Sequence, residues 1–406
     1  MTTLILVESP TKARTLTRFL GSKYDIQASM GHIRDLPKGD IGVDLENNFE
    51  PRYVTPKDKQ KILTGLKKKV KSADTILLAT DPDREGEAIS FHLLEMLTPV
   101  AKKKAVFKRI VFHEITKEAI EEALKNPHEL DLKLVDAQTA RRVLDRVVGY
   151  KLSPLLWKKI KRNLSAGRVQ SIALRLIVER EREVEKFKAS EFYKVFAILE
   201  KDNTKVEFEL VEFDSKRVEV VEKLKLYDGE YSYSSTILDQ TIADKIINEL
   251  KGEVFTISDV SKKQTKRSPL PPFITSSMQQ EASRRIGFNS RRTMQTAQKL
   301  YEEGFITYHR TDSFNLSNQF ITRSRAYIKE AHGTKYLSPE ARIFKTKSKV
   351  AQEAHEAIRP TTVSDISNLK AEISKILGND AVKLYELIFK RAVATQMSDA
   401  LFESTK

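Results

Sequence analysis

The 406-residue sequence contains no cysteine, which excludes disulfide bonds and thiolate metal sites. It has no apolar run near the ~18 residues that a membrane-spanning helix needs, and its first residues lack the layout of a signal peptide. No glycine precedes a lysine, so the Gly-Lys-Ser/Thr phosphate loop of many ATP-binding proteins is missing as well. Together these absences favour a cytoplasmic protein without a membrane partner and without an ATP site.

Positive charge is in excess and clustered. Lys and Arg number 71 against 56 Asp and Glu, which gives a net charge of +15 at pH 7. Nine basic residues and one acid lie between positions 141 and 168, and seven lysines and one aspartate lie between 57 and 71. Beside Tyr150 and Trp157, such runs suit a groove that follows a phosphate backbone and stacks bases. A solvated basic surface is the alternative, but the clustering favours nucleic acid as the partner.

The sequence pattern changes along the chain, which at this length predicts several domains. Residues 1–128 alternate strand-like and helical stretches, with strands at 3–8, 73–80 and 109–115 and helices at 11–21, 85–97 and 116–125. This alternation predicts a parallel sheet whose ligands lie at the carboxyl ends of the strands. The pattern over 129–190 is helical. The pattern over 191–264 is strand-rich, with strands expected at 192–199, 205–213 and 254–260.

A basic, proline-rich stretch at residues 262–273, KKQTKRSPLPPF, predicts a linker and the clearest domain boundary. Beyond it, an apolar helix face ends at Gly287, and Asn289 or Ser290 caps a second helix that Gly304 closes. Two helices, a short turn and a following strand predict a helix-turn-helix-like domain over 265–395. Residues 396–406 would begin a return into the strand-rich domain.

Acidic residues gather where the second buried strand ends. Asp81, Asp83 and Glu85 alternate in TDPDREGEAIS, and carboxylates this close repel one another unless a cation such as Mg²⁺ lies among them. Glu8 ends the first strand, so a parallel sheet places it at the same edge, and Lys12 lies in the following helix turn, which attracts phosphate. An EF-hand would need glutamate at position 92, and neither HEITK nor HEAIR has the second histidine of a zincin. A solvated loop with helix-capping acids is the alternative.

The stretch GFITYHRTDS, residues 304–313, sets Tyr308 among polar residues directly after an apolar pair. It is expected to be the strand that leaves the second helix, with Tyr308 and Arg310 on one face, ~6.6 Å apart. At that spacing the phenol and the guanidinium reach one phosphate, and the cation favours ionisation of the phenol and stabilises developing charge. A tyrosine that packs its ring and bonds through its hydroxyl is the alternative.

Seven motifs follow one another along the chain: VESPTKAR, SMGHIRDLP, TDPDREGEAIS, AQTARRVLDRVVGY, LSAGRVQS, ITYHRTDS and QEAHEAIRP. Together they resemble the type IA DNA topoisomerases, and the bacterial topoisomerase I group in particular. The resemblance implies a multi-domain α/β, α and β fold that forms a toroidal core. Its parts would be a Rossmann-like Toprim domain (1–128), a helical DNA-binding domain (129–190), a strand-rich hinge domain (191–264) and a mobile tyrosine domain (265–395).

The resemblance also implies residue roles. Tyr308 would attack a single-stranded phosphodiester, giving a 5′-phosphotyrosine and a free 3′-hydroxyl, and Arg310 would stabilise the transition state. Glu8 and Lys12 would serve proton transfer and phosphate positioning. The cofactor would be Mg²⁺, held by the carboxylates of Glu8, Asp81, Asp83 and Glu85. The DNA-binding residues would be His32, Arg141, Arg168, Gln170, Asp312 and His355. Because the covalent link keeps the bond energy, negatively supercoiled DNA would be relaxed without ATP.

One departure from the family concerns the end of the chain. Family members return through the strand-rich and helical domains and often end in zinc ribbons, whereas this sequence stops at Lys406. We therefore expect an incomplete toroid, monomeric and nucleoid-associated, in which cleavage is better supported than relaxation.

Other interpretations remain open at this stage. Within the family, reverse gyrase would place a helicase-like region before VESPTKAR, and topoisomerase III departs from ESPTKA and SMGHIRDLP. A Toprim primase or nuclease would lack the tyrosine motif. A non-catalytic single-stranded DNA-binding module would leave the carboxylates and Tyr308 unused.

Overall fold

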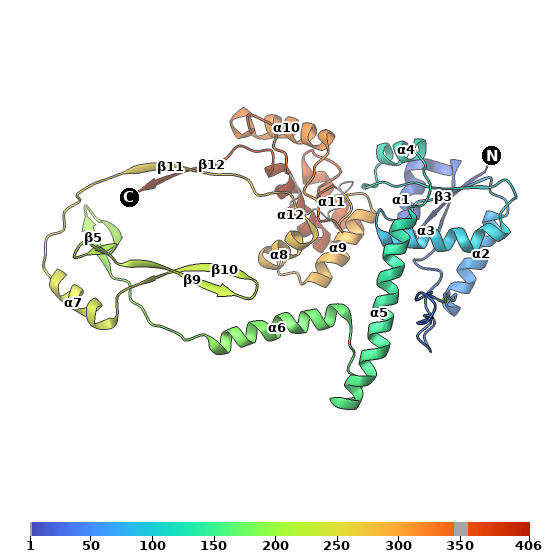
Figure 1. Ribbon diagram of the computed structural model, residues 1–406. Helices are drawn as coiled ribbons and strands as arrows, with labels where there is room; N and C mark the ends of the chain where they lie inside the picture. Colours follow the sequence, from blue (N-terminus) through green and yellow to red (C-terminus); the bar gives the residue numbers. More distant parts are fainter. Residues whose placement is uncertain (1, 345–355) are drawn as a thin grey trace. The chain divides into compact units, whose positions relative to one another are not determined.

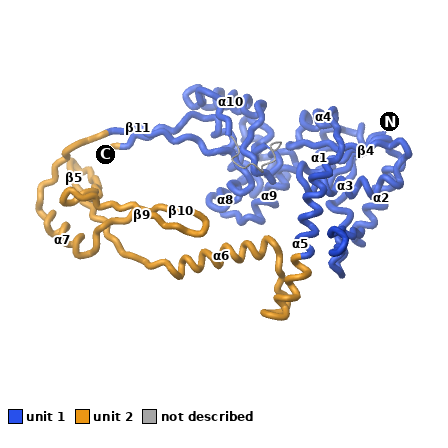
Figure 2. Tube along the Cα trace, in the orientation of Figure 1, with its two compact units in different colours: residues 1–147, 262–404 blue, residues 148–261, 405–406 orange. Residues whose placement is uncertain are grey.

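The computed structural model describes residues 2–344 and 356–406, so the predicted DNA-binding residue His355 lies outside the described residues. The chain divides into two compact units, which Figure 2 distinguishes by colour. Unit 1 comprises residues 1–147 and 262–404, and unit 2 comprises residues 148–261 with 405–406. Within the described residues, no helix combines the length and apolarity needed to cross a membrane.

The N-terminal part of unit 1 is the predicted parallel sheet (Figure 1). Its strands run in the order β2-β1-β3-β4, and all neighbouring pairs are parallel. The strands are β1 (Thr3–Val7), β2 (Asp25–Ala28), β3 (Thr75–Leu78) and β4 (Val106–Arg109). The helices are α1 (Pro10–Leu20), α2 (Gln60–Val70), α3 (Arg84–Leu97) and α4 (Lys117–Lys125), with 3₁₀ turns at Gly21–Lys23, Lys57–Lys59 and Thr98–Val100. The predicted strand–helix alternation is confirmed.

The third predicted strand, 109–115, is displaced. The observed strand β4 ends at Arg109 because its partner β3 ends at Leu78, and beyond Arg109 only the Ile110 N–H still bonds to β3, at the Leu78 carbonyl. Beyond it, Phe112 and Ile115 are buried without a strand partner. The apolar residues between 109 and 115 are therefore explained by burial and not by pairing in a strand.

Two hydrophobic cores lie on the two faces of the sheet. Leu4 and Leu6 of β1 belong to a core with α2 and α3, and Ile5 and Val7 belong to the other core, as the two-residue period of a strand requires. That second core also contains Phe273, Leu300, Tyr301, Tyr308 and many side chains of the C-terminal helices. The tyrosine-bearing segment (residues 265–395) is thus packed directly on one face of the sheet.

This segment contains the two predicted helices, α8 (Thr275–Ile286) and α9 (Ser290–Glu302). Gly287 ends α8 in the left-handed conformation, and the Asn289 side chain caps α9. Gly304 has φ of 85°, and a Cβ there would lie 2.4 Å from the Ile115 carbonyl oxygen, so close packing on the sheet requires glycine. The remaining helices are α10 (Asn318–His332), α11 (Ile366–Leu377) and α12 (Asn379–Ala394), with a 3₁₀ turn at Thr334–Tyr336.

The strand predicted over 304–313 is wrong. The structure has only an isolated bridge between Ile306 and Pro360. Backbone groups of this stretch bond to separate segments: the Thr307 N–H donates to the Arg359 carbonyl, and the Tyr308 N–H donates to the His113 carbonyl at 2.8 Å. The backbone of Tyr308 is thus bonded directly to the N-terminal part of unit 1, residues 2–128, which is called the sheet segment below.

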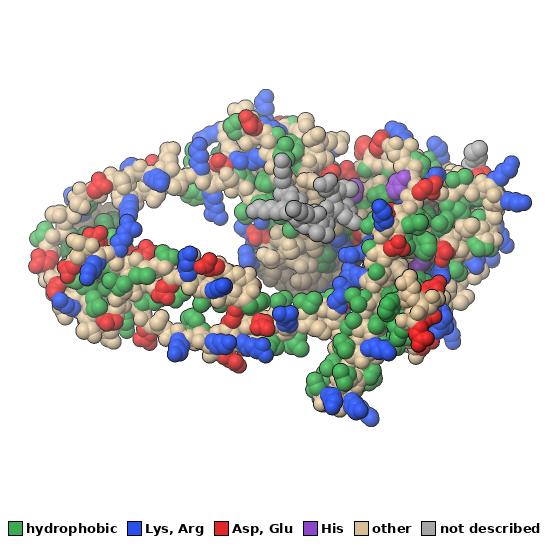
Figure 3. Space-filling model, in the orientation of Figure 1, with side chains coloured by type: hydrophobic (Ala, Val, Ile, Leu, Met, Phe, Trp, Pro, Cys, Tyr) green, Lys and Arg blue, Asp and Glu red, His purple; other side chains and the backbone are tan. Residues whose placement is uncertain are grey.

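Helix α5 (Leu132–Lys159) begins in unit 1 and continues into unit 2. Unit 2 then contains α6 (Arg168–Lys186), α7 (Gln240–Leu250) and three hairpins. The hairpin strands are β5 (Phe196–Lys201) with β6 (Thr204–Glu209), β7 (Glu212–Phe213) with β8 (Lys216–Arg217), and β9 (Glu219–Leu226) with β10 (Gly229–Thr236). The helical and strand-rich character of the two regions is confirmed. Apolar side chains are exposed along α5 and α6 (Figure 3).

Two expectations in and beside unit 2 are wrong. No strand forms at 254–260, where Val254 and Ile257 are exposed, and helix α7 was not predicted. The basic part of the predicted linker is strand β11 (Lys262–Arg267), which pairs with β12 (Ala400–Thr405). Because its partner lies far along the chain, in a segment starting at Ala400, local composition contains no sign of this pairing.

Candidate active site

A buried lysine joins two strand ends of the sheet. The Lys12 ammonium, in the first turn of α1, lies 3.1 Å from a Glu8 carboxylate oxygen and 3.0 Å from Asp81 Oδ1. Its side chain is fully buried and also contacts the Phe112 ring, with 4.9 Å between Nζ and the ring centre. The parallel sheet therefore brings Glu8 and Asp81 to one edge, as predicted, but Lys12 points inward to the carboxylates.

The proton affinities of this group are strongly perturbed. Burial raises the pKa of Glu8 to about 8, although Lys12 acts in the opposite direction. Burial also opposes ionisation of Asp81, yet the attraction of Lys12 lowers the Asp81 pKa below its usual value. For Lys12 itself, the attraction of Asp81 and Glu8 outweighs burial and raises the pKa. At neutral pH the cluster thus contains a cationic Lys12, an ionised Asp81 and a largely protonated Glu8.

Tyr308 reaches the same edge from the tyrosine-bearing segment. Its hydroxyl donates a hydrogen bond of 2.6 Å to Asp83 Oδ2, while Asp83 Oδ1 accepts the Gly86 N–H and caps α3. The Tyr308 ring meets the ring of buried Tyr301 edge-on, with 5.1 Å between centroids. Burial, and then the charges of Asp81 and Asp83, raise the pKa of Tyr308 well above its ordinary value. In this state the phenol keeps its proton.

Glu85 is held separately from the other three carboxylates. His32 Nε2 lies 3.3 Å from Glu85 Oε2, and the Gln138 amide on α5 donates to the same oxygen at 3.2 Å. The hydrogen bond with His32 lowers the pKa of Glu85. His32 and Arg141 also border a smaller cavity of about 400 Å³, beside the buried ring of His92. Burial lowers the pKa of His92 to about 4.

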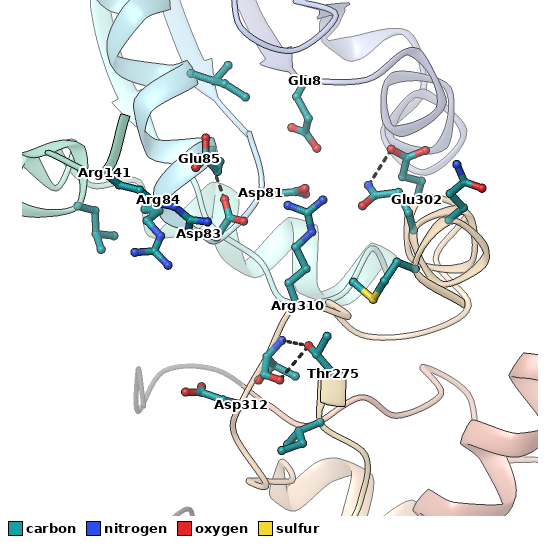
Figure 4. Close-up of a pocket in the computed structure, with 18 of the residues that line it drawn as sticks. Glu8, Asp81, Asp83, Arg84, Glu85, Arg141, Thr275, Glu302, Arg310 and Asp312 are labelled. Atoms are coloured by element: carbon teal, nitrogen blue, oxygen red, sulfur yellow. Dashed lines mark hydrogen bonds between the residues drawn. The ribbon is translucent and has the colours of Figure 1, made fainter. Parts of the chain in front are cut away.

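A larger pocket of about 1520 Å³ opens beside these carboxylates, between the sheet segment and the tyrosine-bearing segment. Figure 4 shows Arg310 extending from the tyrosine-bearing segment toward Asp81, with Asp312 nearby. Polar residues of α8 and α9 complete the lining: Thr275, Ser276, Gln279, Gln295, Gln298, Lys299 and Glu302. The pocket combines a carboxylate wall with an Arg310-bearing wall, a pairing that suits a phosphate with a divalent cation.

The structure brings together most of the predicted site residues. Glu8, Asp81, Asp83, Glu85, His32, Arg141, Arg310 and Asp312 line the large pocket, and Lys12 and Tyr308 bond to its carboxylates. Arg168 and Gln170 begin helix α6 and lie in unit 2. There the Gln170 side chain accepts a hydrogen bond from Ser165.

Several pocket residues were missed by the sequence analysis. Gln138 lies in AQTARRVLDRVVGY, a motif already noted, and its side chain faces Glu85. Gln298 and Glu302 share one face of α9 and bond to each other at 3.0 Å. Their spacing of four residues was the available signal, because it places both side chains on the helix face that also carries Met294 into the pocket.

The carboxylates suit a divalent cation in their chemistry. Mg²⁺ prefers oxygen ligands, and these carboxylates supply them at the ends of two strands. The ammonium of Lys12 lies between Glu8 and Asp81, so this pair accommodates a cation in the structure. In the described part of the chain, no three histidine, aspartate or glutamate side chains converge into one ready-made metal cluster. Asp83 and Glu85 are instead turned to Tyr308 and His32.

Comparisons with known proteins agree with this geometry. The Toprim domain family matches residues 3–115, and the DNA topoisomerase family matches residues 129–406. DNA topoisomerase 1 of Campylobacter jejuni is 47% identical over 410 residues, covering 99% of this chain and 55% of the relative. DNA topoisomerase 1 of Synechococcus elongatus is 46% identical over 416 residues, covering 98% of this chain and 46% of the relative.

A solved structure gives the same result. Full-length topoisomerase I from Thermotoga maritima matches with a TM-score of 0.78 and 39% identity, over 99% of this chain and 62% of that one. The chain spans about half the length of the curated relatives it matches. Reverse gyrase, topoisomerase III and a Toprim primase or nuclease are not favoured by these matches. The chain belongs to the type IA DNA topoisomerases, in the bacterial topoisomerase I group.

Proposed function

We propose that this chain cuts one strand of DNA by forming a covalent 5′-phosphotyrosine at Tyr308 and rejoins the strand by the reverse reaction. The observation that carries the proposal is the hydrogen bond of 2.6 Å from Tyr308 to Asp83 at the edge of the carboxylate cluster. It brings a potential nucleophile from a separate segment of the chain to the wall of a pocket that also contains Arg310.

In the cutting step, Tyr308 Oη forms a bond to phosphorus while the bond from phosphorus to the 3′ oxygen breaks. The phenol proton passes to Asp83 Oδ2, its hydrogen-bond acceptor in the structure. Arg310 in the pocket wall would hold the non-bridging oxygens and stabilise charge in the transition state. Its positive charge also acts to lower the Tyr308 pKa, against the larger effects of burial and the two aspartates.

The leaving 3′ oxygen needs a proton, and we assign its supply to Glu8. With a pKa raised to about 8, Glu8 is mostly protonated near neutral pH, the state that a general acid requires. Lys12 keeps Glu8 and Asp81 together at this edge. In rejoining, Glu8 takes the proton back, the 3′ oxygen attacks phosphorus, and the bond from phosphorus to Tyr308 Oη breaks as Asp83 returns the phenol proton. The bond from phosphorus to the 3′ oxygen is exchanged for a bond of similar energy from phosphorus to Tyr308, so no nucleoside triphosphate is needed.

We assign the divalent-cation site to Asp81, Asp83 and Glu85, with Glu8 beside them. Magnesium bound there would neutralise phosphate charge and help to align the two DNA ends for rejoining. The carboxylate oxygens that Asp81, Asp83 and Glu85 contribute to one pocket support this assignment, since Mg²⁺ prefers oxygen ligands.

Single-stranded DNA is the proposed substrate of the cutting step. The basic stretch from 141 to 168 supplies phosphate contacts, and Tyr150 and Trp157, both partly exposed, supply rings for bases. Relaxation of negatively supercoiled DNA, by a monomer in the cytoplasm at the nucleoid, is the proposed activity of a protein of the relatives' full length.

The experiment that tests the chemistry uses one oligonucleotide labelled at either end. With magnesium and a denaturing stop, the 3′-labelled strand should move with the protein, whereas the 5′-labelled strand should yield a free fragment ending in a 3′-hydroxyl. A nuclease would free both labels, and a DNA-binding module would leave both strands intact. Either result would refute the proposal.

A second experiment tests the cation site in the rejoining step. Cutting is measured beside it, because the variant also lacks Asp83, the proposed acceptor of the phenol proton. Replacing both Asp81 and Asp83 by alanine removes two cation ligands and two charges that repel the DNA backbone. We expect this double variant to bind the oligonucleotide at least as tightly as the parent and to rejoin poorly at millimolar magnesium. Rejoining at the parental rate would contradict the metal assignment.

A further inference from the structure

Arg109 is a buried cation beneath the loop of residues 79–83, which joins β3 to α3 and carries Asp81 and Asp83. It lines neither of the two cavities described above. It ends strand β4, its side chain is 1% exposed, and it is among the largest fully buried side chains in the described residues. A buried charge is costly unless it is paired and its donors are satisfied. Since Arg109 does not line either pocket, direct contact with DNA does not explain its position.

The guanidinium bonds to the start and to the middle of the loop of residues 79–83, which carries Asp81 and Asp83. Its Nη1 donates to the Leu78 carbonyl at 2.9 Å, where β3 ends, and to the Ile110 carbonyl at 2.7 Å. Its Nη2 donates to the Asp81 carbonyl at 2.7 Å. A planar guanidinium fixes the relative positions of its acceptors, which a single ammonium group does not.

Glu87 completes this arrangement and extends it to a second element. Glu87 Oε2 accepts from Arg109 Nε at 2.9 Å, and Oε1 accepts the Asp131 N–H at 2.8 Å, just before α5. Its side chain is 4% exposed. Helix α5 carries Gln138, which bonds to Glu85. One ion pair thus ties the acidic loop, α3 and the start of α5 to each other.

Gly86 shows independently that the loop has one tightly defined path. A Cβ at Gly86 would lie 2.2 Å from the Asp81 carbonyl oxygen, the same oxygen that accepts from Arg109. Thr80 Oγ1 also donates to the Gly86 carbonyl at 2.6 Å. The Asp81 peptide is therefore held between the α3 backbone and Arg109, so the directions of the Asp81 and Asp83 carboxylates depend on this contact.

We propose that Arg109, oriented by Glu87, is a positioning residue that fixes the Asp81 and Asp83 carboxylates for the divalent cation and for Tyr308. The inference rests on the proposed cutting and rejoining reaction. When the Nη2 bond to the Asp81 carbonyl is lost, the loop gains freedom and the cation loses part of its preformed ligand set. DNA binding, which depends on other surfaces, is kept.

The test compares Arg109→Lys and Glu87→Gln with Leu93→Ala. Lysine keeps the charge but cannot reach all the acceptors, and glutamine keeps an acceptor for Asp131 but loses the ion pair. Leu93 lies on α3 in the core on the opposite face from Tyr308 and is fully buried, so its variant lowers stability without touching the loop. Each variant is assayed for oligonucleotide affinity, magnesium dependence of rejoining and hydrogen exchange.

Hydrogen exchange is followed at the Gly86 and Glu87 amides, which both bond to Asp83. We expect both site variants to lose protection there, to bind oligonucleotide like the parent and to need roughly 10- to 100-fold more magnesium for half-maximal rejoining. Leu93→Ala should show neither change. If either Arg109→Lys or Glu87→Gln does not fold, the result of the other variant tests the proposal.

Parental magnesium dependence in a folded site variant would overturn the proposal, as would an equal shift in Leu93→Ala. A parent chain that forms no covalent adduct would refute the proposed reaction alone, because the exchange of the loop amides still reports whether Arg109 positions the loop.

Discussion

In the proposed reaction the tyrosine-bearing segment would move away from the sheet, and a buried ion pair opposes such a movement. Arg359 Nη1 lies 2.8 Å from Glu114 Oε2 in the sheet segment, and Arg359 Nε lies 2.6 Å from Glu356 Oε2 in its own segment. The Arg359 side chain is only 6% exposed, and its Nη2 also donates to Ser317. Glu114 is therefore the charged partner of Arg359 that is lost when the two segments separate.

The change with the clearest expected effect is Glu114→Gln. Breaking a buried ion pair completely costs about 3–5 kcal/mol, and a hydrogen bond to a charged group contributes about 1.5–3 kcal/mol. Because Arg359 keeps Glu356 in the variant, we take the lower range and expect the closed state to be destabilised by about 2 kcal/mol. This free energy makes separation of the two segments roughly 30-fold more frequent. Glu356→Gln is the matched control, since it removes a partner of the same guanidinium without crossing between segments.

Hydrogen exchange of the Tyr308 amide measures this opening, because that N–H donates to the His113 carbonyl across the same contact. Under conditions where exchange follows the opening equilibrium, its rate should rise roughly 30-fold in Glu114→Gln and stay near the parental value in Glu356→Gln. Unchanged exchange in the first variant, or an equal rise in both, would refute the role of this ion pair in holding the site closed.

Three further predictions follow from the site. Because burial lowers the His92 pKa from 6.5 to about 4, the unfolded chain takes up a proton on this side chain at a pH where the folded chain does not. The free energy of unfolding should therefore fall by about 2 kcal/mol from pH 7 to pH 5 through this group. Urea titrations of His92→Gln should lack that part of the loss, and an identical loss would contradict the assignment. Lys12→Met leaves Glu8 and Asp81 without their cation, so magnesium should raise the melting temperature of this variant more than that of the parent; an equal effect would argue against a cation site there. Arg310→Ala should bind oligonucleotide normally and cut about 100-fold more slowly in single-turnover assays, and parental cutting would remove Arg310 from the transition state.

The sequence predicted the edge of the sheet where the site lies because strand order and side-chain position follow from simple periodicity. Glu8 and Asp81 follow the ends of neighbouring parallel strands, so their proximity is a consequence of the sheet that the strand–helix alternation predicts. Asn289 and Gly304 likewise have the conformations that their chemistry demands. These features depend on residues close to one another in sequence, or on the regular geometry of a parallel sheet.

Other parts of the site depend on contacts between distant residues, which a local pattern does not contain. The stretch around Tyr308 was expected to be a strand because an apolar pair, Phe305 and Ile306, leads it. Its backbone partners are instead His113 and Arg359 and not a neighbouring strand. Lys12 was expected to face phosphate, yet two carboxylates draw it inward. The part that Arg109 plays under the acidic loop was invisible, since nothing in its neighbourhood in the sequence indicates its four acceptors.

The most direct test of the central claim is whether Tyr308→Phe can still form a covalent adduct with DNA. Phenylalanine keeps the ring that packs against Tyr301 and removes the only atom proposed to attack phosphorus. With 3′-labelled oligonucleotide and a denaturing gel, the parent should give a labelled protein band, and the variant should bind the oligonucleotide without forming any such band. Peptide mapping of the parental adduct should place the nucleotide on Tyr308. A covalent band that persists in Tyr308→Phe, or an adduct mapped to Tyr301, would contradict the account.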